Sequence, residues 1–172
     1  RENPALSVHA LKISLQFTAR LLPLTDVFTQ GAGVVNIPGA LTLADAIDPA
    51  ATAWLLTSTA LVLLMTPGLA IFYGGMVRTT GVLNMIMMSF IAIPLVTVSW
   101  LLVGYSLAFS GTSAGGLIGG LSHIGMSGIA PDTLHGQVPE LLFATFQLSF
   151  AIITAALVSG AIADRAKFAA WV

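Results

Sequence analysis

The chain has 172 residues, of which 56% are hydrophobic and only 8% are charged, and its formal net charge is −1. This composition is far from that of an ordinary water-soluble domain. The absence of cysteine from the sequence excludes disulfides, thiol catalysis and cysteine-ligated metals, and no basic patch indicates a nucleic-acid partner.

Residues 1–47 differ in character from the rest of the chain. They carry scattered charges and prolines but no apolar run long enough to span a bilayer. Within them, residues 11–24 are modestly amphipathic and contain no acidic residue, so the segment could lie at a membrane interface, belong to a targeting segment or stay disordered. We treat residues 1–47 as an N-terminal segment and residues 48–172 as a membrane domain.

Three long uncharged runs follow, at residues 49–77, 79–130 and 141–163. A soluble helix needs a polar face, so uncharged apolar stretches of this length fit only lipid or the interior of a membrane bundle. We therefore predict an all-α membrane protein. The predicted spans are residues 51–75, 81–109 and 139–163, with the start of a fourth at about residue 168.

Two of these spans carry recognisable start signals. Asp48 is an N-cap acceptor that precedes Pro49 at the first helical position. Pro139 and Glu140 open the third span, with proline in the first turn and the carboxylate beside the positive end of the helix dipole. Pro67 lies inside the first span and predicts a kink, which a membrane helix tolerates when neighbouring groups bind the freed carbonyl.

The basic residues predict the orientation. Arg78 lies in the turn after the first span, and Arg165 and Lys167 lie in the turn after the third, so both turns must be on one side. The positive-inside rule makes that side the cytoplasm. We expect a multi-pass protein of the cell (plasma or inner) membrane, with the N-terminus and the glycine-rich loop at residues 111–137 outside.

Three local sequences, one for each predicted span, carry a resemblance. The first is LVLLMTPGLAIFYGGMVR at residues 61–78, the second is VLNM at 82–85 with GYSLAF at 104–109, and the third is FATFQLSFAIIT at 143–154 with GAIADR at 160–165. In this order and spacing they closely resemble the ammonium transporter / Rhesus protein family, on its bacterial ammonium transporter branch. The resemblance covers roughly residues 51–172, whereas residues 1–45 have no recognised counterpart.

The resemblance implies an eleven-helix bundle that assembles as a homotrimer, with one narrow pore in each subunit. Ammonium is recruited at an outer vestibule, gives up its proton, and ammonia crosses a hydrophobic channel lined by paired histidines. The resemblance also implies a PII-type cytoplasmic regulatory protein as a partner of the full-length form. The chain begins at Arg1 and stops at Val172 as a fourth apolar run begins. We therefore expect a partial chain that supplies the first three to four helices.

The motif around residue 146 carries the expected site residues. The resemblance implies that Phe146 contributes to the outer ammonium site and that Phe150 is one of two stacked rings that close the pore. The two residues are four apart, so their rings lie on one helix face, and an aromatic face attracts a cation by about 0.5–2 kcal/mol. Phe143 lies on the same face, so ordinary packing is the alternative interpretation of these rings.

The histidines do not belong to this pore. His9 lies in the N-terminal segment, and His123 and His135 lie in the outer loop, so the paired pore histidines must come from later helices. No acidic cluster surrounds the loop histidines, so we expect solvated residues, and we expect neither a metal site nor a cofactor.

Transport of ammonium or ammonia is the function that the sequence favours. An ammonium sensor on the same scaffold, coupled to a signalling domain, is the alternative. Chance resemblance in an unrelated polytopic protein is a third interpretation. An enzyme is not expected, because no span carries paired carboxylates or a nucleophile with its base.

Overall fold

A computed structural model describes residues 37–113 and 118–172 of the chain. The amphipathic stretch at residues 11–24 lies outside these residues. The chain divides into two compact units, which are residues 1–53 with 130–141 and residues 54–129 with 142–172.

Within the described residues, three helices are long and apolar enough to cross a membrane. They are α4 (Pro49–Met76), the stretch Val82–Phe109 and α7 (Glu140–Ala161). A helix of 28 residues, the length of the first two, reaches about 42 Å, which spans a bilayer with tilt. The prediction of a helical membrane protein is confirmed.

The second of these stretches is not one regular α-helix. It consists of α5 (Val82–Ser99), the π-helix η1 (Trp100–Gly104) and α6 (Tyr105–Phe109). Each residue advances an α-helix by about 100°, so a π segment rotates the side chains that follow it around the helix axis. This π segment sets the direction of the α6 side chains, and no local pattern in the sequence predicted it.

The smaller unit holds the N-cap that the sequence predicted. Helix α3 (Ile37–Ala46) precedes Asp48, whose Oδ1 accepts hydrogen bonds from the N–H groups of Ala50 (2.8 Å) and Ala51 (3.3 Å). These two groups would otherwise lack partners in the first turn of α4. The Asp48 N–H in turn donates to the carbonyl oxygen of Gln137 at 2.9 Å.

The start of α7 differs from the prediction. Strands β3 (Leu134–His135) and β4 (Val138–Pro139) form an antiparallel hairpin whose turn contains Gly136 at a φ of +64°. Pro139 therefore ends a strand, and α7 begins at Glu140. The Glu140 N–H donates to the Thr133 carbonyl at 2.9 Å, which continues the hairpin and keeps Pro139 out of the helix.

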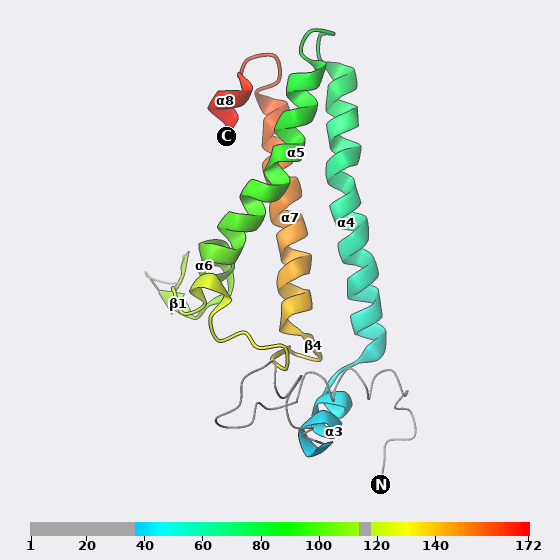
Figure 1. Ribbon diagram of the computed structural model, residues 1–172, viewed down its shortest axis with the longest axis vertical. Helices are drawn as coiled ribbons and strands as arrows, with labels where there is room; N and C mark the ends of the chain where they lie inside the picture. Colours follow the sequence, from blue (N-terminus) through cyan, green and yellow to red (C-terminus); the bar gives the residue numbers. More distant parts are fainter. Residues whose placement is uncertain (1–36, 114–117) are drawn as a thin grey trace, which may run out of the picture. The chain divides into compact units, whose positions relative to one another are not determined.

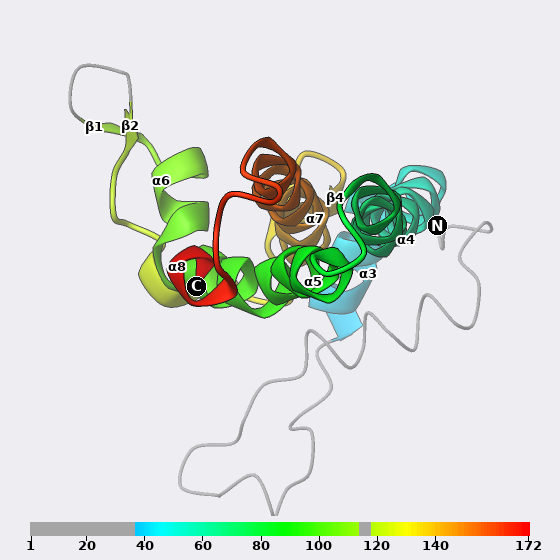
Figure 2. The same cartoon turned by 90° about the horizontal axis from the view of Figure 1, so that it is seen from above.

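In the larger unit, α4, α5 and α7 lie side by side (Figures 1 and 2). Small buried side chains allow this approach, and the core cluster consists of Ala92, Ile153 and Ala156, against which Val62, Leu69 and Ala155 pack. Helix α4 ends at Met76, one residue beyond the predicted end of the first span at residue 75. Gly74 is buried, and an added Cβ there would lie only 3.0 Å from Cγ1 of Ile86.

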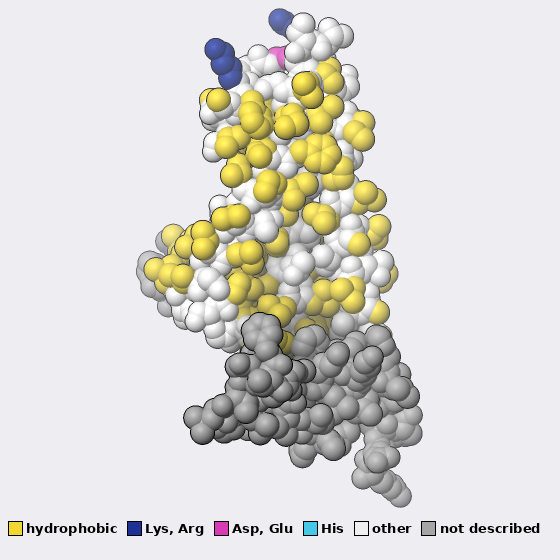
Figure 3. Space-filling view, in the orientation of Figure 1, with side chains coloured by type: hydrophobic (Ala, Val, Ile, Leu, Met, Phe, Trp, Pro, Cys, Tyr) yellow, Lys and Arg dark blue, Asp and Glu magenta, His cyan; other side chains and the backbone are white. Residues whose placement is uncertain are grey.

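Large apolar side chains cover the outside of these helices (Figure 3). Only 11% of the most apolar part of α4 is buried inside the protein. Such a helix is stable only where lipid or further apolar protein surrounds it. The three exposed cations Arg78, Arg165 and Lys167 lie in the turns after α4 and α7. Lys and Arg side chains are visible at one end of the larger unit (Figure 3).

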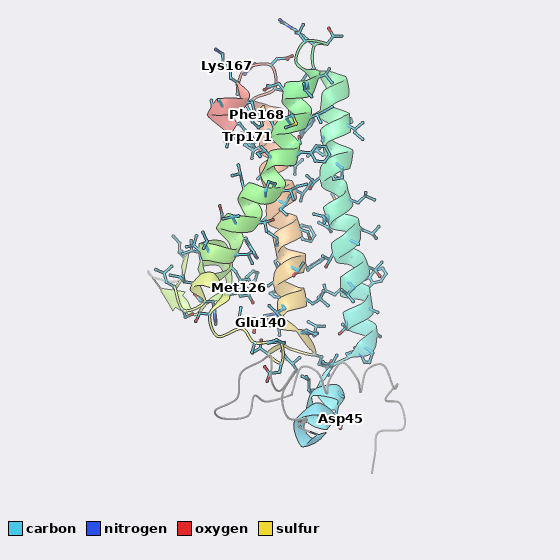
Figure 4. All side chains as sticks on the ribbon, in the orientation of Figure 1. Asp45, Met126, Glu140, Lys167, Phe168 and Trp171 are labelled. Atoms are coloured by element: carbon cyan, nitrogen blue, oxygen red, sulfur yellow. The ribbon has the colours of Figure 1, made fainter. Side chains whose placement is uncertain are left out.

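The short helix α8 (Phe168–Trp171) follows the second of these turns and lies beside α5 (Figure 4). The indole N–H of Trp171 donates to the carbonyl oxygen of Met88 at 2.8 Å, and the amide of Asn84 donates to the carbonyl of Ala166 at 3.2 Å. These two bonds hold the chain after α7 against α5.

Candidate functional site

The two phenylalanines that the sequence singled out are in direct contact on α7. The ring centroids of Phe146 and Phe150 lie 5.1 Å apart at an interplanar angle of 79°, an edge-to-face arrangement. Phe146 is half-buried, whereas Phe150 keeps 42% of its surface exposed. The regular spacing of four residues along the helix brings the rings together.

Two hydroxyls near these rings are turned onto the helix backbone. The Ser149 hydroxyl donates to the Phe146 carbonyl at 2.6 Å, and the Thr154 hydroxyl donates to the Phe150 carbonyl at 2.7 Å. A hydroxyl that donates to a backbone carbonyl in this way has its hydrogen-bonding requirement satisfied within the helix, so it can lie in an apolar environment. These two hydroxyls therefore do not compete for a cation at the rings, and the attraction between a cation and a ring is stronger where water is removed.

This geometry can hold a small cation without trapping it. An edge-to-face pair uses one face of one ring, so other ring faces remain to meet a cation within about 6 Å of a centroid. An ammonium ion would be attracted without a permanent charge on the protein, which suits a passage that must release what it binds.

Phe143, on the same side of α7, has a different surrounding. Its ring meets the ring of Phe109 on α6 at a centroid distance of 5.1 Å and an angle of 76°. Phe143 thus serves the contact between two helices, and the sequence could not separate it from its neighbours at positions 146 and 150.

Phe109 belongs to a group of rings that the sequence analysis missed. Its centroid lies 6.2 Å from that of Trp100 and 5.3 Å from that of Tyr105, and Tyr105 is only 1% exposed. A signal existed in the GYSLAF motif and in the tryptophan before it, but the π-helix that turns these rings toward one another has no clear local signature.

Ser106 of α6 and Ser110, the residue that caps its end, fix the loop that follows. The hydroxyls of Ser106 (3.0 Å) and Ser110 (2.6 Å), one helical turn apart, both donate to the carbonyl oxygen of Gly120. The His123 N–H donates to Ser106 Oγ at 3.0 Å. Gly119 makes this approach possible, because a Cβ there would lie 2.6 Å from the carbonyl oxygen of Leu107.

The loop histidines differ from each other. His123 is half-buried, its ring centroid lies 6.3 Å from that of Tyr105, and Nδ1 lies 3.0 Å from the Ser127 carbonyl, to which it donates. His123 is therefore partly covered by the folded loop, which gives it partners. His135 is exposed. Among residues 37–113 and 118–172, no group of three acidic or histidine side chains could hold a metal ion.

Comparison with known proteins gives consistent matches. The sequence model of the Ammonium Transporter Family matches residues 53–172. An ammonium transporter of Mycobacterium tuberculosis is 53% identical over 141 residues, which cover 72% of this chain and 29% of the relative. An ammonium transporter of Aquifex aeolicus is 47% identical over 131 residues, covering 73% and 30%. Ammonium transporter Amt1 of Archaeoglobus fulgidus is 42% identical over 120 residues, covering 70% and 29%. The chain spans less than a third of the length of these curated relatives.

Proposed function

Because the chain belongs to the ammonium transporter family, we propose that the protein passes ammonium or ammonia across a membrane through a pore to which α7 contributes. The contact between Phe146 and Phe150 on a membrane-spanning helix is the observation that carries this proposal. The family consists of transporters, so we assign no enzymatic activity. The names of the three relatives give no support to the alternative of an ammonium sensor.

We propose different roles for the two rings. Phe146, half-buried, contributes to an outer site that recruits the cation. Phe150, 42% exposed, has surface left on which a ring from another helix can stack to close the pore. The loss of one ring from a cation site costs about 0.5–2 kcal/mol, which corresponds to roughly 2- to 30-fold weaker binding.

Uptake of labelled methylammonium tests these roles in the protein as the cell makes it, expressed in a strain that lacks its own ammonium uptake. We expect Phe146→Ala to weaken apparent affinity by roughly 2- to 30-fold with a smaller change in maximal flux. We expect Phe150→Ala to alter or abolish selective uptake, because water enters a dry constriction. Rates are normalised to inserted protein. Wild-type uptake by both variants would show that the rings only pack.

We also propose the topology. The turns with Arg78 and with Arg165 and Lys167 face the cytoplasm of a plasma-membrane protein, and the N-terminal segment at residues 1–47 lies outside. Single cysteines at Thr79 and at Ser122, both exposed positions, are labelled on intact cells with an impermeant thiol reagent. Labelling is expected at position 122 only. Labelling at position 79 alone would show that the orientation is the opposite of the proposed one.

A homotrimer is the assembly that we propose from the family resemblance. The large exposed apolar side chains of α4 and α5 supply surface for contacts with neighbouring protein. The mass of the detergent-solubilised protein, measured by light scattering with the bound detergent subtracted, is expected to equal three chains. A mass equal to one chain would contradict the proposed trimer.

The family resemblance also supports a PII-type regulatory protein as a cytoplasmic partner. Its binding is expected at the end that carries the exposed Arg78, Arg165 and Lys167. Pull-down from membranes is the test, with Lys167→Glu as the variant. Equal capture of wild-type and variant protein would place the partner elsewhere.

A further inference from the structure

We propose that Phe109 is a positioning residue for the cation site on α7. Its ring braces Phe143 and so fixes where the rings at positions 146 and 150 lie relative to the neighbouring helix. The proposal rests on the proposed function. In this proposal the end of α6 contributes to recruitment of the cation, although Phe109 itself does not touch the cation.

The ring of Phe109 is held from its own side of the contact. Trp100 meets it at 6.2 Å with an angle of 73°, and Tyr105 meets it at 5.3 Å with an angle of 36°. Tyr105 is 1% exposed and cannot move without disturbing its surroundings. Phe109 is therefore fixed by two rings of the preceding turns.

The π-helix and the serine contacts decide where this ring points. Phe109 follows the π segment Trp100–Gly104, so its direction differs from that on a continuous α-helix. Ser106 and Ser110 flank it and bind the same carbonyl oxygen, that of Gly120. The α6 turn that carries Phe109 is thus tied to the loop and cannot rotate freely.

The fixed ring then acts on α7 through Phe143. The two rings meet edge to face at 5.1 Å. Phe143 precedes Phe146 by three residues and Phe150 by seven, so the three lie on one side of the helix. The attraction between a cation and a ring requires about 6 Å or less between the cation and the ring centroid. A shift of about 1 Å in this part of α7 therefore weakens the attraction between the cation and the rings.

The test compares leucine variants by methylammonium uptake, normalised to inserted protein. We expect Phe109→Leu and Phe143→Leu each to weaken apparent affinity by roughly 2- to 10-fold, a part of what a lost cation–ring contact costs, while maximal flux is retained. The double variant should match the single variants, because either change removes the same contact. Phe109→Tyr keeps the ring and should keep wild-type affinity.

Phe90→Leu is the matched control, because Phe90 is 41% exposed and Phe109 is 38% exposed. It should leave affinity unchanged. Should Phe109→Leu fail to insert into the membrane, Phe109→Met, of similar bulk and greater flexibility, takes its place. A residue with a purely structural role would lower the amount of inserted protein and leave the affinity of the remainder at the wild-type value.

Phe146→Ala, measured in parallel, separates the two ideas. Weaker affinity for Phe146→Ala with wild-type affinity for Phe109→Leu would refute the positioning role of Phe109 and leave the proposed cation site intact. Wild-type affinity for Phe146→Ala would refute the proposed cation site. It would also refute the proposal that Phe109 and Phe143 position that site. Additive losses in the double variant of Phe109 and Phe143 would also overturn the proposal, because the rings would then act separately.

Discussion

Replacing Gly160 with alanine is expected to disturb the contact between α7 and α4. A Cβ at Gly160 would lie 2.7 Å from Cε2 and from the hydroxyl oxygen of Tyr73, and closer still to Cζ, whereas ordinary contacts begin at 3.4 Å. The Tyr73 ring must therefore move by about 0.7 Å or more. Its hydroxyl, which donates to the Leu157 carbonyl at 3.4 Å, moves with it. Overpacking of this kind costs about 1–3 kcal/mol.

The free energy of unfolding of the variant is measured by sodium dodecyl sulfate titration of the protein in mixed micelles. Gly75→Ala is the matched control, because Gly75 is a helical glycine of α4 with no heavy atom within 4 Å of the added Cβ. The control should be neutral or gain up to about 1 kcal/mol from the lower entropy of its unfolded chain.

A second substitution tests the cause of the loss. Tyr73→Leu shortens the side chain that opposes the new methyl group, so it should restore part of the stability that Gly160→Ala removes. The two changes should therefore not be additive. Wild-type stability of Gly160→Ala, or strict additivity with Tyr73→Leu, would refute the close contact between the helices.

Three further changes test other parts of the structure. Asp48→Ala removes the cap of α4 and should cost about 0.5–2 kcal/mol, measured as faster amide exchange in the first turn, whereas Asp48→Asn should retain most of the cap. Gly119→Ala places a methyl group against the α6 backbone and should expose the outer loop to proteolysis, whereas Gly111→Ala, with open space around it, should not. Trp171→Phe loses the hydrogen bond to α5 and should cost about 0.5–1.5 kcal/mol in the same detergent titration, and an unchanged value would show that the bond is not needed.

The sequence by itself determined the features that a few neighbouring residues decide. The long uncharged runs required a membrane because no polar face was available, and the structure has apolar helices there. Asp48 before Pro49 predicted the start of α4, because a cap needs only the next two or three N–H groups. The contact between Phe146 and Phe150 followed from a spacing of four on a helix.

Only the tertiary structure decided which distant groups meet. Phe143 has the same local pattern as its neighbours, and its contact with Phe109 depends on the π segment in the preceding span. The lack of a side chain at Gly74 and Gly160 admits Ile86 and Tyr73 from other helices. Helix periods and caps act over one or two turns, whereas these contacts form only after separate helices pack, so no local pattern could predict them.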